Sequence, residues 1–523
     1  MKINDMYFGK TDAYNEFLEY GADSFKEIFF DVYNIDVNKM LNGGIYYILG
    51  KKGTGKTMLL KYIEAKVNEE PETRFSKFIR FKRDVDEEQR NMMKRSGVPD
   101  NGFEEIIDSE IPDDVTIDCT LAWQAYIIKV IVNRIQQTER GVFKRNKDWD
   151  KLIILVKEVY GGEEKEEKST IQRIIPKLKR GNIELDVDKI AKAKIEFEWE
   201  NLQSGIVRFS SVAKRIIELY QMLYPVDNSI YIFVDELELS FKKNKSYKRD
   251  VALIRDLIVA VERLSDWNRN NGYNVFLIAA IRSEVYNSVI AIGNEINKSI
   301  ADFGITITWG QNGGNIEEHP LLKMLEKRIH YSEQKFGLSE TSNIWTAYFP
   351  KEVFNKKIQN YILDQTWGKP RDIIRLFGLI KQQYGSKEMF TQDVFEGIRK
   401  SYAKESWIEL SETLSASYNT TSIEGVKKTF IGIKLPFTLN EYKEILKLKM
   451  EYFDEVKELM RTHQNVVGIL DDLYRNGIIG NYERKQVRFF FKGDDDFDPT
   501  MAITLHYPLL RFFDAKKHSR RRI

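Results

Sequence analysis

The sequence has very little cysteine and no long apolar run. Cys119 is the single cysteine among 523 residues, so no disulfide can form within the chain, which fits a reducing compartment. The first residues lack the apolar core of a signal peptide. The longest apolar runs, such as 275–281, are too short to cross a bilayer. We therefore expect a cytoplasmic protein that does not enter a membrane.

The sequence also lacks a large excess of positive or negative charge. The chain holds 81 Lys and Arg against 79 Asp and Glu, a net charge of +2, so the whole surface shows no bias toward polyanions. At 523 residues the chain is too long for one core and long enough for three or four domains. Function must therefore be inferred from local motifs.

One glycine-rich motif carries a defined chemistry. Residues 50–57 read GKKGTGKT, a full match to GxxxxGK[ST]. An apolar strand is predicted over 45–49 and an amphipathic helix from about Lys56, the context that a phosphate-binding loop requires. Glycines let successive N–H groups face a polyphosphate, and the helix start adds its positive dipole end. The predicted nucleotide-binding residues are Gly50, Lys51, Lys52, Gly53, Thr54, Gly55, Lys56, Thr57 and Met58.

Two side chains of this loop have predicted roles toward ATP. Lys56 is expected to reach the β- and γ-phosphates, and the Thr57 hydroxyl to ligate Mg²⁺. A glycine-rich turn that matches by chance is the alternative, and the flanking strand and helix argue against it.

A second motif places acids at the end of a strand. Residues 229–236 read SIYIFVDE, and a continuous apolar run indicates a strand buried on both faces. Acids at its carboxyl end lie where ligands bind in parallel sheets. Asp235 is predicted to hold Mg²⁺ through water, and Glu236 to orient or deprotonate the attacking water, with Glu238 as the second candidate. Thr57 and Asp235 are 235 − 57 = 178 residues apart, which predicts an insertion at about 138–205. Whether the insertion is decoration or a partner surface stays open.

Two arginines are candidate γ-phosphate sensors. Arg282 follows the apolar strand predicted over 274–281, beside the expected phosphate site. Arg371 follows the break made by Gly368 and Pro370, so it falls in the first turn of a new helix. The alternative for each is an ordinary ion pair, with Asp372 as one partner for Arg371.

Alternating strands and helices predict an α/β fold with a parallel sheet. This fold class is a P-loop NTPase core with a helical lid and a C-terminal winged-helix domain. The lead-in, with a helix predicted over 22–32, is expected to pack on the core. The predicted divisions are a lead-in at 1–44, the core at 45–317, the lid at 318–405, a winged-helix-like domain at 406–515 and a basic tail at 516–523.

The charge of residues 401–523 argues against a winged helix that binds in a DNA groove. Residues 401–523 hold 20 basic and 18 acidic residues, and five of the basic ones lie in the tail. Without the tail, 15 basic and 18 acidic residues leave a net charge of −3. Backbone binding to DNA needs Lys and Arg on the docking face, so we expect a protein-contact or autoinhibitory role there. DNA contact through the basic tail stays open.

The motifs GKKGTGKT, IYIFVDE, IAAIRSE and GKPR, with the winged-helix pattern, resemble AAA+/STAND-type ATPases near the Orc-like branch. The opening MYFGKTDAYNE, the segment LYRNGIIGN at 473–481 and His506-x-x-Leu509 are similar to a bacterial family of phosphate-loop ATPases, often found beside phage-defence genes. The resemblance implies an ATP-driven switch with Mg²⁺, a setting in antiviral defence, and Arg371 as the lid sensor. No repeat array or effector domain is visible, so a partner protein is expected to supply the output.

Three functions follow from these motifs. The first is an ATP-hydrolysing switch that controls a partner or an assembly, the second an Orc-like ATPase that remodels or loads onto DNA, and the third a binding module in which ATP is structural. DNA-stimulated turnover separates the first two, and measurable turnover separates both from the third. Self-association into a homo-oligomer stays open.

Overall fold

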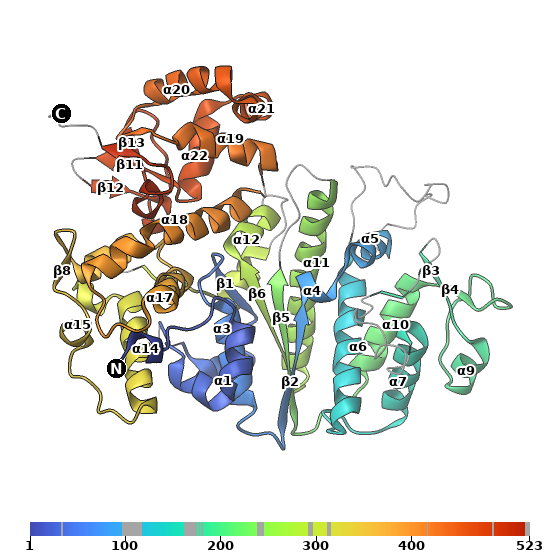
Figure 1. Cartoon of the computed structure of the whole chain (residues 1–523). Helices are drawn as coiled ribbons and strands as arrows, with labels where there is room; N and C mark the ends of the chain where they lie inside the picture. Colours follow the sequence, from blue (N-terminus) through green and yellow to red (C-terminus); the bar gives the residue numbers. More distant parts are fainter. Residues whose placement is uncertain are drawn as a thin grey trace. The chain divides into compact units, whose positions relative to one another are not determined.

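The computed structural model describes residues 1–32, 35–96, 118–161, 175–176, 178, 181–237, 245–290, 296–310, 315–415, 417–483 and 486–517. Glu238, part of the predicted insertion and most of the basic tail lie outside them. The chain divides into two compact units (Figure 1). The helical unit comprises Met1–Tyr33, Gly53–Gly55 and Thr308–Ile523, and the sheet unit comprises Asn34–Lys52 and Lys56–Ile307.

A five-stranded parallel sheet with the order β2-β5-β6-β1-β7 organises the sheet unit, which confirms the predicted parallel α/β fold. Because β6 lies between β1 and β5, the carboxyl ends of three strands that carry candidate site residues meet at one edge. The strands are β1 Tyr47–Gly50, β2 Arg74–Arg80, β5 Ser229–Leu237, β6 Val275–Arg282 and β7 Gly304–Thr306. Beside the sheet are α2 Val37–Leu41, α3 Lys56–Val67, α4 Phe81–Asp84, α5 Glu87–Ser96, α6 Thr120–Thr138, α7 Lys147–Tyr160, α9 Val187–Lys192, α10 Phe209–Gln221, α11 Lys245–Asn270, α12 Ser283–Ile290, α13 Ile296–Phe303 and the pair β3 Asn182–Glu184 and β4 Ile206–Arg208.

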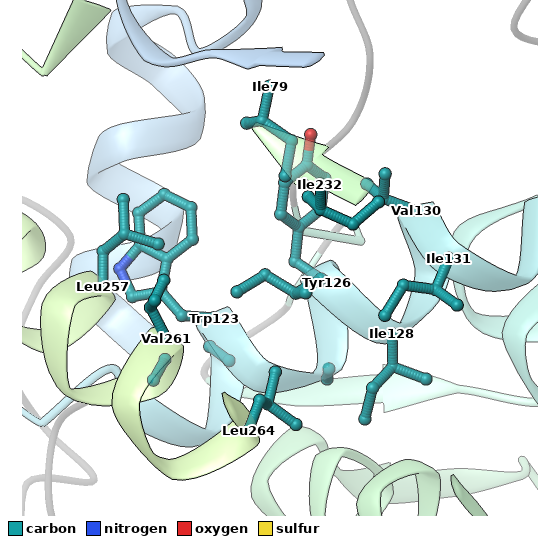
Figure 2. Close-up of a cluster of buried hydrophobic side chains, with 14 of the residues drawn as sticks. Ile79, Trp123, Tyr126, Ile128, Val130, Ile131, Ile232, Leu257, Val261 and Leu264 are labelled. Carbon is teal, nitrogen blue, oxygen red and sulfur yellow. The ribbon is translucent and has the colours of Figure 1, made fainter. Parts of the chain in front are cut away.

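Side chains of β5 alternate between two packed faces. Ile232 belongs to the large apolar core that includes α6 and α11, where Trp123 of α6 lies beside Leu257 of α11 (Figure 2). Phe233 points to the opposite face, where its ring centroid is 4.8 Å from that of Phe78 on β2. Each fully buried Leu, Ile or Phe stabilises the fold by roughly 1.5–3 kcal/mol. A strand buried on both faces explains the continuous apolar run in the sequence.

Local structure differs from the sequence predictions in three places. The polar and acidic composition of 83–115 predicts a loop or a small excursion, but α5 occupies Glu87–Ser96 and buries Gln89 and Met93, and 97–115 lie outside the described residues. A helix was expected over 190–199, but α9 ends at Lys192. The helix expected over 22–32 is α1, which runs from Ala13 to Ile28. In α5 the apolar signal is weak because charged partners, rather than apolar side chains, hold much of the helix: Arg249 donates to Glu87 and Asn91 at 2.6 Å.

Asp256 of α11 has a buried carboxyl group that contacts the start of α6. Its Oδ2 accepts the Cys119 N–H at 2.7 Å, and Arg255 lies 2.7 Å from Oδ1. Burial raises the pKa of Asp256 from 3.8 to about 6, although the Cys119 N–H and Arg255 act in the opposite direction. The folded protein therefore holds a proton here that the unfolded chain releases at lower pH.

This shift predicts a pH dependence of stability. As pH rises from about 4 to about 6, the contribution of Asp256 to the free energy of unfolding should fall by roughly 1–3 kcal/mol. Asp256→Asn should flatten that slope in urea unfolding measured at pH 4.5, 5.5 and 6.5, whereas Asp227→Asn at an exposed position should keep it. An unchanged slope in Asp256→Asn would contradict the assignment.

The helical unit is built from helices followed by a small antiparallel sheet. Its sheet has the order β12-β11-β13, and it follows α21 and α22 as the sequence predicts. The sequence predicts the second strand over 487–491, but β12 spans Gln486–Arg488 and a 3₁₀ turn begins at Phe490. The helices are α1 Ala13–Ile28, α14 Pro320–Lys335, α15 Ile344–Ala347, α16 Ile358–Asp364, α17 Pro370–Tyr384, α18 Gln392–Leu414, α19 Thr420–Phe430, α20 Leu439–Tyr452, α21 Asp454–Thr462 and α22 Val466–Arg475. The strands are β8 Glu352–Val353, β9 Lys356–Lys357, β10 Lys434–Leu435, β11 Ile479–Glu483, β12 Gln486–Arg488, β13 Ala502–Leu505 and β14 Lys516–Lys517, and the 3₁₀ turns are η1 Ile3–Asp5, η2 Ile316–Glu318, η3 Phe490–Lys492 and η4 Tyr507–Leu510.

Residues 1–33 of the predicted lead-in belong to the helical unit, whereas we expected the lead-in helix to pack on the core; 34–44 belong to the sheet unit. Glu16 and Arg328 of α14 form a buried ion pair at 3.2 Å, with side chains 1% and 4% exposed. The Tyr7 hydroxyl donates a hydrogen bond to the Glu16 carboxylate. A Cβ at Gly9 would lie 1.6 Å from Arg328 Nη1, so only glycine fits there. The opening motif is therefore built around a charge pair with α14.

The start of the predicted basic tail is part of a strand pair. Lys516 and Lys517 form β14, which pairs in parallel with Lys434 and Leu435 of β10.

Within the described ranges, no helix combines the length and the apolar character that a membrane crossing requires.

Candidate functional site

The glycine loop joins the end of β1 to the start of α3. α3 begins at Lys56, as predicted, and β1 spans Tyr47–Gly50, so it starts two residues later and ends one residue later than the predicted strand. Gly53 and Gly55 have φ angles of 85° and 94°, a left-handed backbone that residues with a Cβ rarely adopt. The loop path therefore depends on glycine at both positions.

Lys56 places its ammonium group inside the curve of the loop. Its Nζ donates to the carbonyl oxygens of Gly50 at 2.8 Å and Lys51 at 3.0 Å, and the residue is 8% exposed. Lys52 lies half-buried in the same loop, and Met58 lies half-buried in the first turn of α3. A positive charge is thus fixed where the backbone turns.

Thr57 meets Asp235 in the sheet unit, although 178 residues separate them in the sequence. The Thr57 Oγ1 donates to Asp235 Oδ2 at 2.8 Å, and Asp235 is 3% exposed near the end of β5. A hydroxyl and a carboxylate are oxygen donors, the ligand type that Mg²⁺ prefers together with phosphate and water oxygens. The donor set therefore fits the metal that the sequence predicts.

Glu236 sits in a strained bulge at the end of β5. Its φ is 59°, and the pairing of β5 with β6 shifts register between Val234 and Leu237. The Glu236 N–H donates to Asp235 Oδ1 at 2.8 Å. Non-glycine residues in this backbone region cost energy, persist only where surrounding structure holds them, and cluster at functional sites. The bulge therefore interrupts the regular in-and-out alternation of side chains along β5 at Glu236.

Arg80 is a site residue that the sequence interpretation missed. Its Nη2 and Nε lie 3.2 and 3.3 Å from Glu236 Oε1, so the two side chains form a charge-assisted contact. Arg80 ends β2 and is the Cα partner of Asp235 across the strand pair. The alternating run FSKFIRF at 75–81 predicts a strand, and a charged residue near its carboxyl end was the available signal, as it was for Arg282.

Arg282 ends β6 at the same edge of the sheet. It is the Cα partner of Gly50 on β1, so it stands level with the beginning of the glycine loop. Its side chain is half-buried. The sheet unit thus brings together the ends of β1, β5 and β6 with their candidate residues.

Arg371 belongs to the helical unit, unlike Lys56, Asp235 and Glu236. It lies in the first turn of α17, as predicted, and its Nη1 is 3.6 Å from Glu409 Oε1, with 30% of the side chain exposed. Asp372, the partner first considered, pairs with Arg375 at 3.0 Å.

The helical unit also includes the tip of the glycine loop, Gly53–Gly55. The Trp309 indole donates to the Thr54 carbonyl at 2.8 Å. A Cβ at Gly53 would lie 3.4 Å from the Cβ of Arg371. The loop tip and Arg371 are therefore neighbours within this unit.

Comparison with known families gives one match. Residues 319–411 match a family model described as the FunZ-associated C-terminal helical domain. This segment runs from the N-cap of α14 into α18 and contains Arg371. Comparison with curated proteins found no match.

Proposed function

We propose that the chain is an ATP-binding and ATP-hydrolysing molecular switch of the AAA+/STAND type, with a P-loop core, that controls a partner protein or assembly. The observation that carries this proposal is the 2.8 Å hydrogen bond from Thr57 Oγ1 to Asp235 Oδ2. It joins the two motifs that sequence reasoning assigned to one Mg²⁺–phosphate site. The glycine loop and the buried Lys56 beside it support the phosphate part of that site.

Each residue has a separable role in this proposal. The loop amides and Lys56 bind and orient the phosphates, and Thr57 and Asp235 hold Mg²⁺. When bound, Mg²⁺ neutralises charge on the β- and γ-phosphate oxygens. Glu236 accepts the proton of the attacking water, and Arg282 contacts the γ-phosphate from the fixed sheet. Arg80 holds the Glu236 carboxylate before reaction.

Arg371 is proposed to read the nucleotide state from the start of α17. ATP shifts a lid only through contacts that one state makes and the other lacks. Arg371→Ala should fold and bind ADP normally, hydrolyse ATP about tenfold more slowly, and lose the ATP-versus-ADP difference in hydrogen exchange over residues 360–380. Arg371→Lys should restore part of that difference because it keeps the charge. Wild-type nucleotide-dependent protection in Arg371→Ala would show that the arginine is structural.

Acids of α22 argue for a protein partner over DNA. Asp472 accepts the Tyr418 hydroxyl at 2.7 Å, and Asp471 pairs with Arg475 at 2.8 Å. The helix that a winged-helix protein would present to a groove thus carries these two acids and one basic residue, Arg475, which is already paired with Asp471, so it offers phosphates little attraction. The Orc-like activity therefore ranks second.

The experiment that tests the function is phosphate release from ATP, with and without duplex DNA, together with mass measurement in ATP and in ADP. We expect turnover that DNA changes by less than about threefold, since the net charge gives no general attraction to polyanions. Stimulation by DNA of about tenfold or more would favour the loader activity. Nucleotide binding without turnover would favour a structural role for ATP.

A further inference from the structure

Three segments whose sequences resemble those of phosphate-loop ATPases converge on Trp367. These are the turn 367–371, the segment 473–481 and the turn that begins at His506. The Trp367 indole Nε1 donates to the Gly477 carbonyl at 2.9 Å, and its ring centroid is 4.6 Å from that of His506. Trp367 is 4% exposed and belongs to the apolar core of the C-terminal sheet and helices. All of these residues lie in the helical unit.

The pocket around the indole has no spare room. Gly477 has a φ of 69°, and a Cβ there would lie 2.7 Å from Trp367 Cδ1 and 2.9 Å from Phe491 Cδ1. The His506 ring is also packed edge-on against Phe489 at 4.9 Å and Phe491 at 5.0 Å. Burial lowers the pKa of His506 well below its usual value, so it packs as a neutral ring. Gly477 lies just before β11 and His506 just after β13, so the turns beside these two strands hold Trp367.

The other end of Trp367 is tied to the helix that carries Arg371. The Trp367 N–H donates to Asp372 Oδ2 at 2.7 Å, and Asp372, 2% exposed, pairs with Arg375 at 3.0 Å. Arg375 and Arg371 both reach the Glu409 carboxylate of α18. The indole and the backbone of one residue thus connect the C-terminal sheet to the first turn of α17.

We propose that Trp367 is a positioning residue through which the C-terminal sheet β11–β13 sets the placement of Arg371. Displacement of that sheet breaks the indole contact with Gly477 and loosens the turn that begins α17. The lid arginine then loses the geometry in which it distinguishes ATP from ADP. The inference rests on the proposed function, because it assigns the C-terminal sheet control over the same nucleotide sensor.

Trp367→Phe is the test variant, because it removes the indole donor and keeps most of the apolar ring. Trp407→Phe is the matched control: Trp407 belongs to the same core and stacks on Phe512 at 5.8 Å, away from the Gly477 contact. Both variants should lose similar thermal stability. Trp367→Phe alone should raise the KM for ATP about 3- to 10-fold, as expected for one hydrogen bond, and reduce the ATP-versus-ADP exchange difference over residues 366–375.

A second variant pair perturbs the contact from the sheet. Gly477→Ala crowds the indole, and Gly493→Ala carries a comparable backbone strain at φ 91° with nothing within 4 Å of the added Cβ. Gly477→Ala should repeat the Trp367→Phe effect, and Gly493→Ala should not.

Equal ATP responses from the test and control members of both pairs would overturn the inference. A wild-type protein that does not bind ATP would overturn the proposed function instead. In that case, nucleotide-free exchange over 366–375 still decides whether the indole holds this turn, because only Trp367→Phe and Gly477→Ala should accelerate it.

Discussion

Lys56→Ala is expected to lower ATP hydrolysis by at least about 100-fold and to weaken ATP binding. Lys56 Nζ is held within 3.0 Å of two loop carbonyl oxygens, so its charge is already placed where a polyphosphate would lie in the proposed site. Alanine removes this charge and leaves the glycine backbone that forms the loop. Phosphate release and fluorescence titration with a labelled ATP measure the two effects.

Lys66→Ala is the matched control for Lys56→Ala. Lys66 lies near the end of the same helix, where it pairs with Glu69 at 3.0 Å on the surface. Its loss should change turnover by less than about twofold, since exposed pairs contribute little. Normal turnover in Lys56→Ala would contradict the assignment of the glycine loop as the phosphate site.

Glu236→Gln is expected to keep ATP affinity within about threefold and to lower turnover by roughly 10²- to 10⁴-fold. The amide has nearly the same size as the carboxylate but cannot accept the proton of the attacking water. Equilibrium binding and single-turnover hydrolysis separate the two quantities. If turnover per bound ATP stays normal, Glu236 is not the base and Glu238 becomes the next residue to test.

Arg80→Gln tests the contact that the structure adds to this account. Arg80 lies 3.2 Å from Glu236 Oε1, so its guanidinium occupies one of the lone pairs of that carboxylate. A neutral glutamine should free the carboxylate and raise turnover about 3- to 10-fold. Arg134→Gln, which loses a contact to the Ser76 carbonyl on the same strand, should leave turnover unchanged.

The sequence was sufficient to place the central strands of the sheet, because each is a continuous apolar run that is buried on both faces. The start of α3 at Lys56 and the start of α17 at Pro370 were also predictable, since glycine and proline fix those boundaries locally. The same local rules placed Arg371 in the first turn of its helix.

The contacts that complete the site were not predictable in this way. The bulge at Glu236 depends on how β5 pairs with β6, and the Arg80 contact depends on β2 lying beside β5. Neither pairing is written in local sequence, because strand order is set by long-range packing. The grouping of the N-terminal lead-in with α14 has the same origin: a buried ion pair between Glu16 and Arg328, 312 positions apart (328 − 16), outweighs proximity in sequence.

Calorimetric titration of ATP with and without Mg²⁺ tests the central claim most directly. The account predicts that the wild-type protein binds ATP more tightly with Mg²⁺, and that Asp235→Asn loses this metal-dependent gain while it keeps metal-free ATP binding. The reason is that Asp235 and Thr57, joined at 2.8 Å, supply the protein oxygens for the metal. A wild-type protein that binds no ATP, or an Asp235→Asn variant with the full Mg²⁺ gain, would contradict the account.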